Sequence, residues 1–273
     1  ADLAFYSRAA SARSRNASED ERSRLRHKFF AGLVGPPPEP LVAPNPELGD
    51  LPFVAITDSF LDAVRAGSVK ARVASVEGFG DNSVVFSDGA SEEFDDVILA
   101  TGYRLELPFL PPAARSALEL QPDDQLQPAI LHEAVWPLGP PRLAFVGLYR
   151  GPYFAAIELQ ARWACGVFSG RLPPPASQEL ADGLELERRI RAQRPRPQFP
   201  HGDYVGMVEA LAKHVGVHPS AILEDSAHPL HTLLLDGPLL PFHFRLVGFG
   251  AKPEVAEATI RECAARFPVQ ASM

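Results

Sequence analysis

Two short runs of apolar residues stand out from the otherwise mixed pattern of this chain, at residues 97–100 and 143–148. Each has the length of a strand and lacks the alternation of a strand with one face in water. The runs therefore predict strands at 95–100 and 143–148 that are buried on both faces, as in a parallel sheet. Each ends in small, turn-permissive residues, so we expect both strands to deliver backbone to the ligand-binding edge of a sheet.

Alternation with a period of two residues predicts three further strands. Val69, Ala71 and Val73 alternate with charged neighbours and predict a half-buried strand. Residues 84–86 predict a second strand, which Asp88-Gly89 follows as a turn signal. Residues 241–247 alternate aromatic or aliphatic with polar side chains and predict an extended strand.

Apolar residues at helical spacing predict six helices, at residues 58–66, 154–168, 177–193, 203–215, 219–223 and from 253 onward. Gly67 and Gly170 are placed to end two of them. The expected inward face of the second helix consists of Phe154, Ile157, Ala161, Ala164 and Phe168. The expected inward face of the helix at 203–215 consists of Tyr204, Val208, Leu211 and Val215. The expected inward face of the last helix consists of Ala256, Ile260, Cys263 and Phe267.

Composition narrows the function classes. The chain has 273 residues and is 46% hydrophobic, which is enough for one large domain or two smaller ones. Its net charge of −8 makes nonspecific binding to nucleic acid or anionic membranes unfavourable. We expect no membrane-spanning helix, because the apolar runs have only strand length. Without a visible signal peptide or CxxC spacing, we expect a cytoplasmic protein with Cys165 and Cys263 as small core residues.

The segment 2–28 is rich in arginine, with Glu19, Asp20 and Glu21 interleaved. Its basic residues could form a patch for the 2′-phosphate of NADP, or they could face solvent along a connecting helix. We favour the solvated helix, because the acidic residues neutralise the segment and few apolar anchors accompany them.

Several separate segments resemble the flavin-containing monooxygenases, in the family's order and approximate spacing. They are Asn45–Pro52, Phe86–Gly89, Asp95–Tyr103, Pro108–Leu110, Leu143–Leu148, Glu158–Trp163, Gly202–Tyr204, Gly216–Pro219 and Gly237–Gly248. There are also departures: Phe244 replaces the family's tyrosine, and Gly250-Ala251-Lys252 replaces its Gly-Lys-Trp. The chain also contains no GxGxxG fingerprint and no Phe-x-Gly-x-x-x-His signature, all of which belong to the family's N-terminal half.

The resemblance implies an α/β fold: part of a flavoprotein with two Rossmann-like dinucleotide-binding domains and a helical C-terminal region. In this interpretation residues 1–100 are the remainder of the NADP-binding domain. Residues 101–273 are then the C-terminal part of the FAD-binding domain, with terminal helices. A chain without the glycine fingerprints should bind FAD only weakly by itself and be inactive alone.

For the complete enzyme, the resemblance implies an FAD- and NADPH-dependent monooxygenase of the N,N-dimethylaniline type. A C4a-hydroperoxyflavin formed with O₂ would oxygenate the nitrogen of an amine or the sulfur of a thioether, and the enzyme could be a homodimer. A Baeyer–Villiger or N-hydroxylating relative is the alternative within enzymes. An alternative of another class is a non-catalytic truncated remnant or interaction module.

The resemblance also implies the cofactor-binding residues. They are Thr101, Gly102, Tyr103, Gly147, Leu148, Tyr149, Gly151, Tyr153 and Phe154. Residues 147–154 form a strand–turn–helix connection, which aims free N–H groups at an anion, although an ordinary tight connection would look the same.

No catalytic residue or metal ligand emerges from the spacing. Glu158 and Arg162 lie four residues apart on a predicted helix, so an ion pair is a simpler interpretation than catalysis. The eight histidines show no HExxH pattern, so we expect no metal site.

Overall fold

The computed structural model describes residues 6–18, 57, 59–139, 142–149, 151, 153–194, 196 and 203–266, together with residues 20–22, 24, 25, 28, 32, 35 and 38–41. The chain divides into two compact units, which are described separately. Unit 1 consists of Ala1–Ser18 and Arg104–Met273, and unit 2 of Glu19–Tyr103. The first eighteen residues therefore belong with the C-terminal helices.

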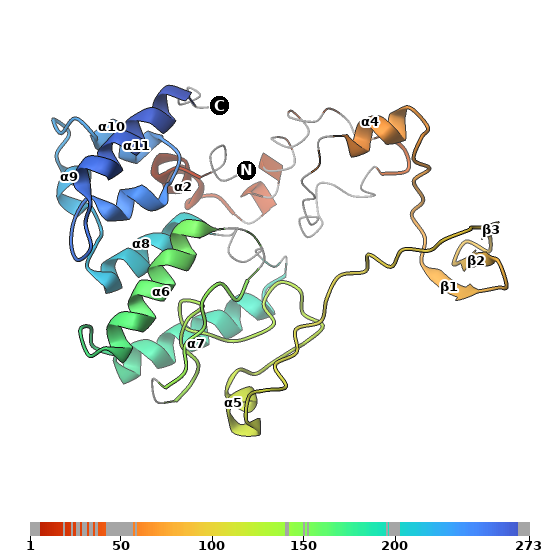
Figure 1. The fold of residues 1–273 in the computed structure, drawn as a ribbon, viewed down its shortest axis with the longest axis horizontal. Coiled ribbons are helices and arrows are strands. Elements are labelled where there is room, and N and C mark those ends of the chain that lie inside the picture. Colours follow the sequence, from red (N-terminus) through yellow and green to blue (C-terminus); the bar gives the residue numbers. More distant parts are fainter. Residues whose placement is uncertain are drawn as a thin grey trace. The chain divides into compact units, whose positions relative to one another are not determined.

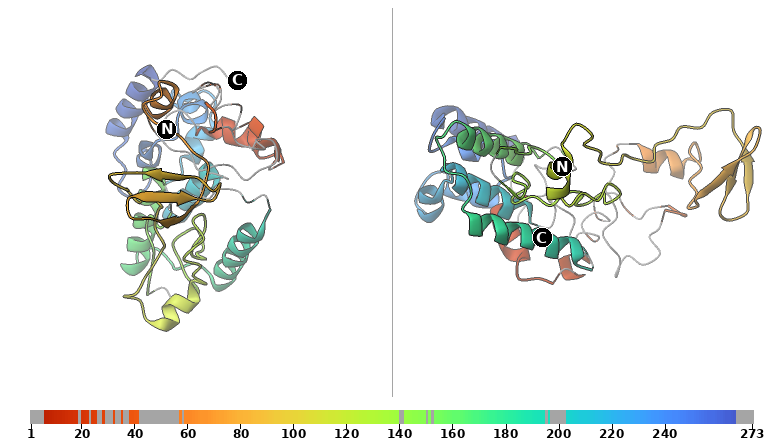
Figure 2. Two further views of the ribbon diagram at one scale, coloured as in Figure 1. Left: turned by 90° about the vertical axis from the view of Figure 1, so that its right-hand side faces the viewer. Right: turned by 90° about the horizontal axis from the view of Figure 1, so that it is seen from below.

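Unit 2 contains a helix and a small sheet. Helix α4 spans Phe60–Arg65, and strands β1 (Val76–Phe79), β2 (Ser83–Phe86) and β3 (Ser91–Glu93) form an antiparallel sheet in that order (Figure 2). The helix predicted at 58–66, the strand at 84–86 and the Asp88-Gly89 turn are confirmed. Gly89 has a φ of 82°, a value that glycine adopts without strain.

The alternation at residues 69–73 does not form a strand. Instead, Lys70 lies 3.1 Å from the carboxylate of Glu92 on β3, and Arg72 pairs with the same carboxylate. The Arg72 guanidinium also lies 4.6 Å from the centre of the Phe86 ring. Side-chain contacts of Lys70 and Arg72 therefore hold this segment against the sheet without backbone pairing. A two-residue sequence period does not distinguish this arrangement from a paired strand.

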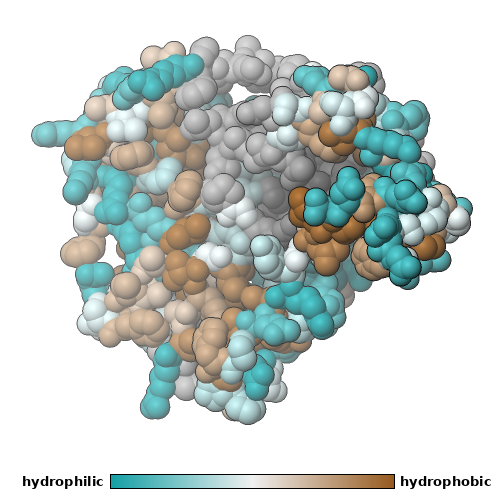
Figure 3. Space-filling view, turned by 45° about the vertical axis from the view of Figure 1, so that its right-hand side comes forward, coloured by the Kyte–Doolittle hydropathy of each residue, from teal (hydrophilic) through white to brown (hydrophobic). Residues whose placement is uncertain are grey.

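The strand predicted at 95–100 is also wrong. Residues 96–103 of unit 2 belong to no strand, and the trace after β3 is drawn there without an arrow (Figure 1). Ile98 is 90% exposed, Leu99 73% and Tyr103 97%. A strand buried on both faces needs neighbouring strands, and β1–β3 pair only with one another in the described part of unit 2. Apolar side chains of this segment therefore stay exposed. On the face of the molecule in Figure 3, hydrophobic residues lie among hydrophilic ones.

Unit 1 is helical. Its elements are α2 (Arg8–Ser14), α5 (Pro112–Ala117), α6 (Phe154–Phe168), α7 (Ser177–Ala192), α8 (Tyr204–Val215), α9 (Ser220–Glu224), α10 (His231–Asp236), the 3₁₀ helix η1 (Pro241–Arg245) and α11 (Pro253–Arg266). The helices predicted at 154–168, 177–193, 203–215, 219–223 and from 253 are therefore confirmed. None of the described helices is long and apolar enough to cross a membrane.

The main core lies where α6 packs against α8 (Figure 1). Tyr204, Val208, Leu211 and Val215 are all buried, as the spacing along α8 predicts. Asp203 caps this helix by accepting the Gly206 N–H at 2.9 Å. On α11, Ala256 and Ile260 are buried and Cys263 is half-buried, whereas Phe267 lies outside the described residues.

The predicted face of α6 is wrong except at Ala164, which is buried. The buried residues are Ala155, Ala156, Leu159, Gln160, Trp163, Ala164 and Gly166. Phe154 is 65% exposed, Phe168 55%, and Cys165 is exposed as well. The ring of Trp163 stacks on His214 of α8 and meets Trp136 edge-on. Packing of this large ring sets the rotation of the helix, which a count of apolar positions cannot anticipate.

Two further strand predictions in unit 1 are wrong. Residues 241–245 form η1, where Pro241 fixes φ at the first position and the His243 N–H donates to the Leu240 carbonyl at 3.1 Å. Residues 143–148 form no regular strand. The Phe145 N–H donates to the Val135 carbonyl at 2.9 Å, which ties this run to a loop rather than to a sheet.

The expectation of a solvated helix fails over α2, where only Ala12 and Arg13 are exposed and Arg8 is buried. This side chain is 7% exposed and forms an ion pair with Glu209 of α8 at 2.8 Å. It also donates to the Leu234 carbonyl at 2.8 Å and lies 2.9 Å from Nδ1 of His243. Burial, and secondly the charge of Arg8, hold the pKa of His243 well below its usual value. Arg8 thus joins α2, α8, α10 and η1 through one buried charge.

Replacement of Arg8 by Met should lower the free energy of unfolding by about 3–5 kcal/mol, because the half-buried Glu209 carboxylate loses its guanidinium partner and keeps only its contact with His218 among its pairs. Urea denaturation followed by circular dichroism measures the loss. Arg13→Met on the exposed face of α2 is the matched control and should change stability by less than about 0.5 kcal/mol. Equal losses in the two variants would show that the Arg8 contacts do not hold unit 1 together.

Candidate functional site

The N-terminal end of α6 brings together six of the predicted cofactor residues, Gly147, Leu148, Tyr149, Gly151, Tyr153 and Phe154. Tyr153 occupies the N-cap position and makes no side-chain hydrogen bond to the helix. The first N–H groups of a helix have no partner within the helix and carry its positive partial charge. This end of α6 can therefore stabilise an anionic group.

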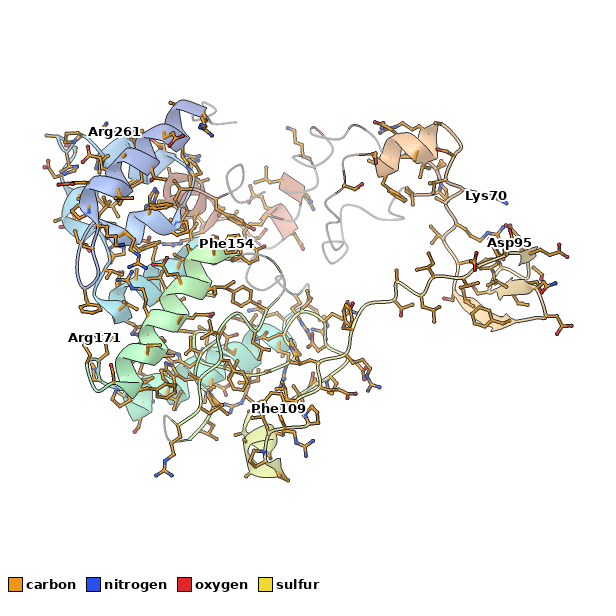
Figure 4. The ribbon with its side chains drawn as sticks, in the orientation of Figure 1. Lys70, Asp95, Phe109, Phe154, Arg171 and Arg261 are labelled. Carbon is orange, nitrogen blue, oxygen red and sulfur yellow. The ribbon has the colours of Figure 1, made fainter. Side chains whose placement is uncertain are left out.

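The predicted residues differ in what they present to a ligand. Phe154, labelled at the start of α6 in Figure 4, is 65% exposed and Val146 is 44% exposed, so both offer apolar surface. Tyr153 is 3% exposed, and its ring centre lies 4.8 Å from that of Tyr204. Tyr149 donates from its hydroxyl to the Tyr153 carbonyl at 3.4 Å. The two tyrosines therefore shape the turn by packing, whereas Phe154 is open to contact.

Gln160 fixes this turn, although the sequence analysis did not single it out. Its side chain is fully buried on α6 and its Oε1 accepts the Gly147 N–H at 2.9 Å. Its Nε2 donates to the carbonyls of Glu133 and Ala134, each at 3.3 Å. Both turns contain left-handed residues, with φ of 70° at Gly147 and 51° at Glu133. One amide thus holds two irregular turns to the helix.

Thr101, Gly102 and Tyr103 belong to unit 2 and lie in its exposed extended segment. Gly102 has a φ of 88°, which permits the change of direction that the sequence suggested. Their assignment to a cofactor stays a prediction.

Glu158 and Arg162 form the expected ion pair on α6, with 3.4 Å between their charged atoms. Arg162 also donates to the carbonyls of Phe244 at 3.0 Å and Phe249 at 2.5 Å, and Arg245 lies 2.8 Å from Glu158. These contacts connect α6 to η1 and the turn after it. The two side chains are therefore structural connectors, as the spacing favoured.

A second group of polar side chains gathers where α7 begins and α8 ends. His132, Glu179 and His214 place one ligand-type atom each within 4.8 Å of one another. Burial lowers the pKa of His132 to about 4, helped by His214, and burial also lowers the pKa of His214. The spacing analysis missed this group because its members are far apart in the sequence and only the packing of α7 and α8 brings them together.

Two half-buried acids lie near the loop that Gln160 holds. Burial raises the pKa of Glu187 on α7 to about 8, with a further contribution from Glu133. Burial and the charge of Glu179 raise the pKa of Glu133 to about 7. Gln127 donates from its side chain to the Glu187 carboxylate. A cleft of about 10 Å³ between Glu187 and Leu148 has room for about one water molecule, so it is no cofactor pocket.

These observations define what the α6 end can do. It can offer backbone donors and apolar contact to one edge of a planar, anionic group. The chain contains no GxGxxG sequence to cradle a pyrophosphate. The residues therefore fit one wall of a dinucleotide cofactor site rather than the whole of it.

Comparison with known proteins extends over most of this chain. A family model described as flavin-binding monooxygenase-like matches residues 51–267. The flavin-containing monooxygenase 5 of Oryctolagus cuniculus is 33% identical over 204 residues, which cover 71% of this chain and 37% of that protein. The dimethylaniline monooxygenase (N-oxide-forming) 2 of Rattus norvegicus is 34% identical over 205 residues, with the same coverage. The chain thus spans little more than a third of the length of these relatives.

Replacement of Gln160 by Leu should lower the free energy of unfolding by about 1–3 kcal/mol, because it leaves the Gly147 N–H and two carbonyls without their partner. Denaturant unfolding measures the effect. The matched control is Gln178→Leu on α7, where the side chain is exposed and donates to the carboxylate of Asp182 at 2.8 Å. A Gln160 variant as stable as the Gln178 variant would contradict the role assigned to this amide.

Glu187 should make unit 1 less stable as the pH rises. Its folded-state pKa of about 8 lies above the usual value of 4.5, so its contribution is complete below about pH 4.5 and is lost through pH 8. Glu187→Gln removes this titration. The stability of the variant relative to the native chain should therefore increase with pH, by at most about 1.4 kcal/mol per unit. Urea denaturation from pH 5 to 9 checks this, and a constant difference across that range would contradict it.

Proposed function

Because this chain belongs to the flavin-binding monooxygenase-like family, we propose that it forms the C-terminal portion of an FAD- and NADPH-dependent monooxygenase. The observation that carries the proposal is the N-terminal end of α6, where Gln160 holds the Gly147 turn beside uncapped N–H groups and the exposed Phe154. A bound flavin would supply hydride acceptance from NADPH and reaction with O₂.

The chain's own residues then have distinct parts. The N–H groups at the start of α6 would stabilise negative charge on a bound flavin, as a helix N-terminus stabilises other anions. The exposed side chains of Phe154 and Val146 would offer the bound flavin apolar contact and help to exclude water from it. Gln160 is a positioning residue, since it touches the turn rather than the cofactor.

The exposed segment 95–103 supports the rest of the proposal. Its apolar side chains are typical of a strand that has neighbouring strands on both sides. The relatives are nearly three times as long as the matched part, so their additional sequence could supply those neighbours. In the complete protein this segment would join a Rossmann-like sheet and bring Thr101, Gly102 and Tyr103 to the cofactor. Unit 2 would then be part of the NADP-binding domain and unit 1 part of the FAD-binding domain.

The substrate would be a soft nucleophile, either an amine nitrogen or a thioether sulfur. The name of the Rattus norvegicus relative supports the choice of an amine: it describes a dimethylaniline monooxygenase that forms an N-oxide. A Baeyer–Villiger or N-hydroxylating enzyme would share the flavin and differ in taking a ketone or a primary amine.

A chimaera tests the proposal. It joins the N-terminal part of the Oryctolagus cuniculus enzyme to this chain, in place of the part that the chain matches. We expect the purified chimaera to retain flavin through desalting, absorb near 450 nm and oxidise NADPH in the presence of a thioether, with sulfoxide as product. The N-terminal part alone is the control and should show none of these.

The outcomes separate the candidate functions. Sulfoxide formation without turnover of a cyclic ketone supports the proposal, whereas ketone turnover alone supports the Baeyer–Villiger alternative. A chimaera that shows native circular dichroism but stays colourless would contradict both and favour a non-catalytic remnant.

A further inference from the structure

The group His132, Glu179 and His214 contains none of the predicted cofactor residues. His132 comes from the loop before Trp136, Glu179 from the first turn of α7, and His214 from the last turn of α8. Oε1 of Glu179 lies 3.5 Å from Nδ1 of His214 and 4.0 Å from Nε2 of His132. Three segments distant in the sequence thus present their ligand-type atoms to one point.

One of these atoms lacks a hydrogen-bond partner. The His132 side chain is 7% exposed, and its Nε2 has no hydrogen-bond partner among the described residues. Buried polar atoms without partners are uncommon, because each costs about 1–3 kcal/mol. The atom faces the Glu179 carboxylate at 4.0 Å, which is too far for a direct hydrogen bond. Something placed between the two groups would satisfy both.

The spacing suits a metal ion. Tetrahedral Zn²⁺ with bonds of about 2.0–2.1 Å separates its ligand atoms by about 3.4 Å. The separations of 3.5 and 4.0 Å here need only small side-chain adjustments to reach that value. Two imidazoles and one carboxylate favour Zn²⁺ over Mg²⁺ or Ca²⁺, which prefer oxygen ligands alone. Each histidine in its neutral form can offer the lone pair of one ring nitrogen to the metal ion.

The surroundings orient the ligand groups. The second carboxylate oxygen of Glu179 accepts the Ala176 N–H at 3.2 Å, which turns Oε1 toward the histidines. The His214 ring lies flat on Trp163, with 4.1 Å between ring centres. A Cβ on Gly183 of α7 would overlap the His132 ring at Nδ1, so that ring is held against the helix. Glu179 is 40% exposed, which leaves a route from solvent and room for a water ligand.

From this geometry we infer that His132, Glu179 and His214 form a Zn²⁺ site that joins the loop before Trp136 to α7 and α8. The fourth position is open to water. The site is independent of the proposed flavin chemistry, and its binding energy adds to the stability of unit 1.

Titration of the full 273-residue chain with Co²⁺ tests the site. We expect one equivalent to produce the visible absorption band of tetrahedral Co²⁺ and one equivalent of Zn²⁺ to abolish it. Glu179→Gln and His214→Gln should each weaken Zn²⁺ binding by at least about tenfold, since the loss of an outer-shell partner alone costs that much. Circular dichroism establishes that each variant is folded.

Two controls keep the result specific. Glu185→Gln removes the same charge from an exposed position of the same helix and should leave binding unchanged. Cys165→Ser should also leave it unchanged, although that thiol is exposed. Zn²⁺ should raise the thermal unfolding midpoint of the native chain and of Glu185→Gln but not that of Glu179→Gln. Absence of the Co²⁺ band, equal affinity in the Glu179 and Glu185 variants, or loss of binding in Cys165→Ser would overturn the inference.

Discussion

The irregular parts of unit 1 depend on one buried amide. Gln160 has no contact with solvent, yet its side chain uses both ends: Oε1 holds the Gly147 turn and Nε2 holds the carbonyls of residues 133 and 134. Both turns contain left-handed residues, and backbone hydrogen bonds such as the bridge between His132 and Trp136 also fix the second turn. One turn carries the candidate flavin wall, and the other follows directly after His132. A hydrophobic residue of the same size would fill the space but leave three backbone groups unsatisfied.

Two buried or half-buried arginines also hold irregular backbone in place in unit 1. Arg8 enters the interior from α2 and meets Glu209, the Leu234 carbonyl and His243. Arg162 connects α6 to the carbonyls of Phe244 and Phe249. In both cases a guanidinium satisfies backbone carbonyls that no helix or strand pairs, which suits a fold built from short helices and turns. The motif around Arg162 is thus explained by structure and needs no catalytic role.

The inward face of a helix could be predicted from the sequence where its buried positions follow a simple helical period. The inward face of α8 was predicted at all four positions, because Tyr204, Val208, Leu211 and Val215 follow helical spacing without competition. The face of α6 was wrong because the packing of Trp163 determines its rotation. The strand at 95–100 was wrong because the described part of unit 2 offers it no neighbour. Within the candidate site, the Gly147 turn and Phe154 came from the sequence, whereas Gln160 and the histidine pair did not, since no spacing reveals a contact that tertiary packing creates.

If the hydrogen bonds of Gln160 shape one wall of a flavin site, the flavin content of the chimaera depends on this residue. The measurement is the ratio of bound FAD to protein after desalting, at a temperature where circular dichroism shows every variant to be folded. The account predicts that the native chimaera and its Gln178→Leu control retain FAD equally and that Gln160→Leu retains much less. A folded Gln160→Leu chimaera with undiminished FAD content would contradict it.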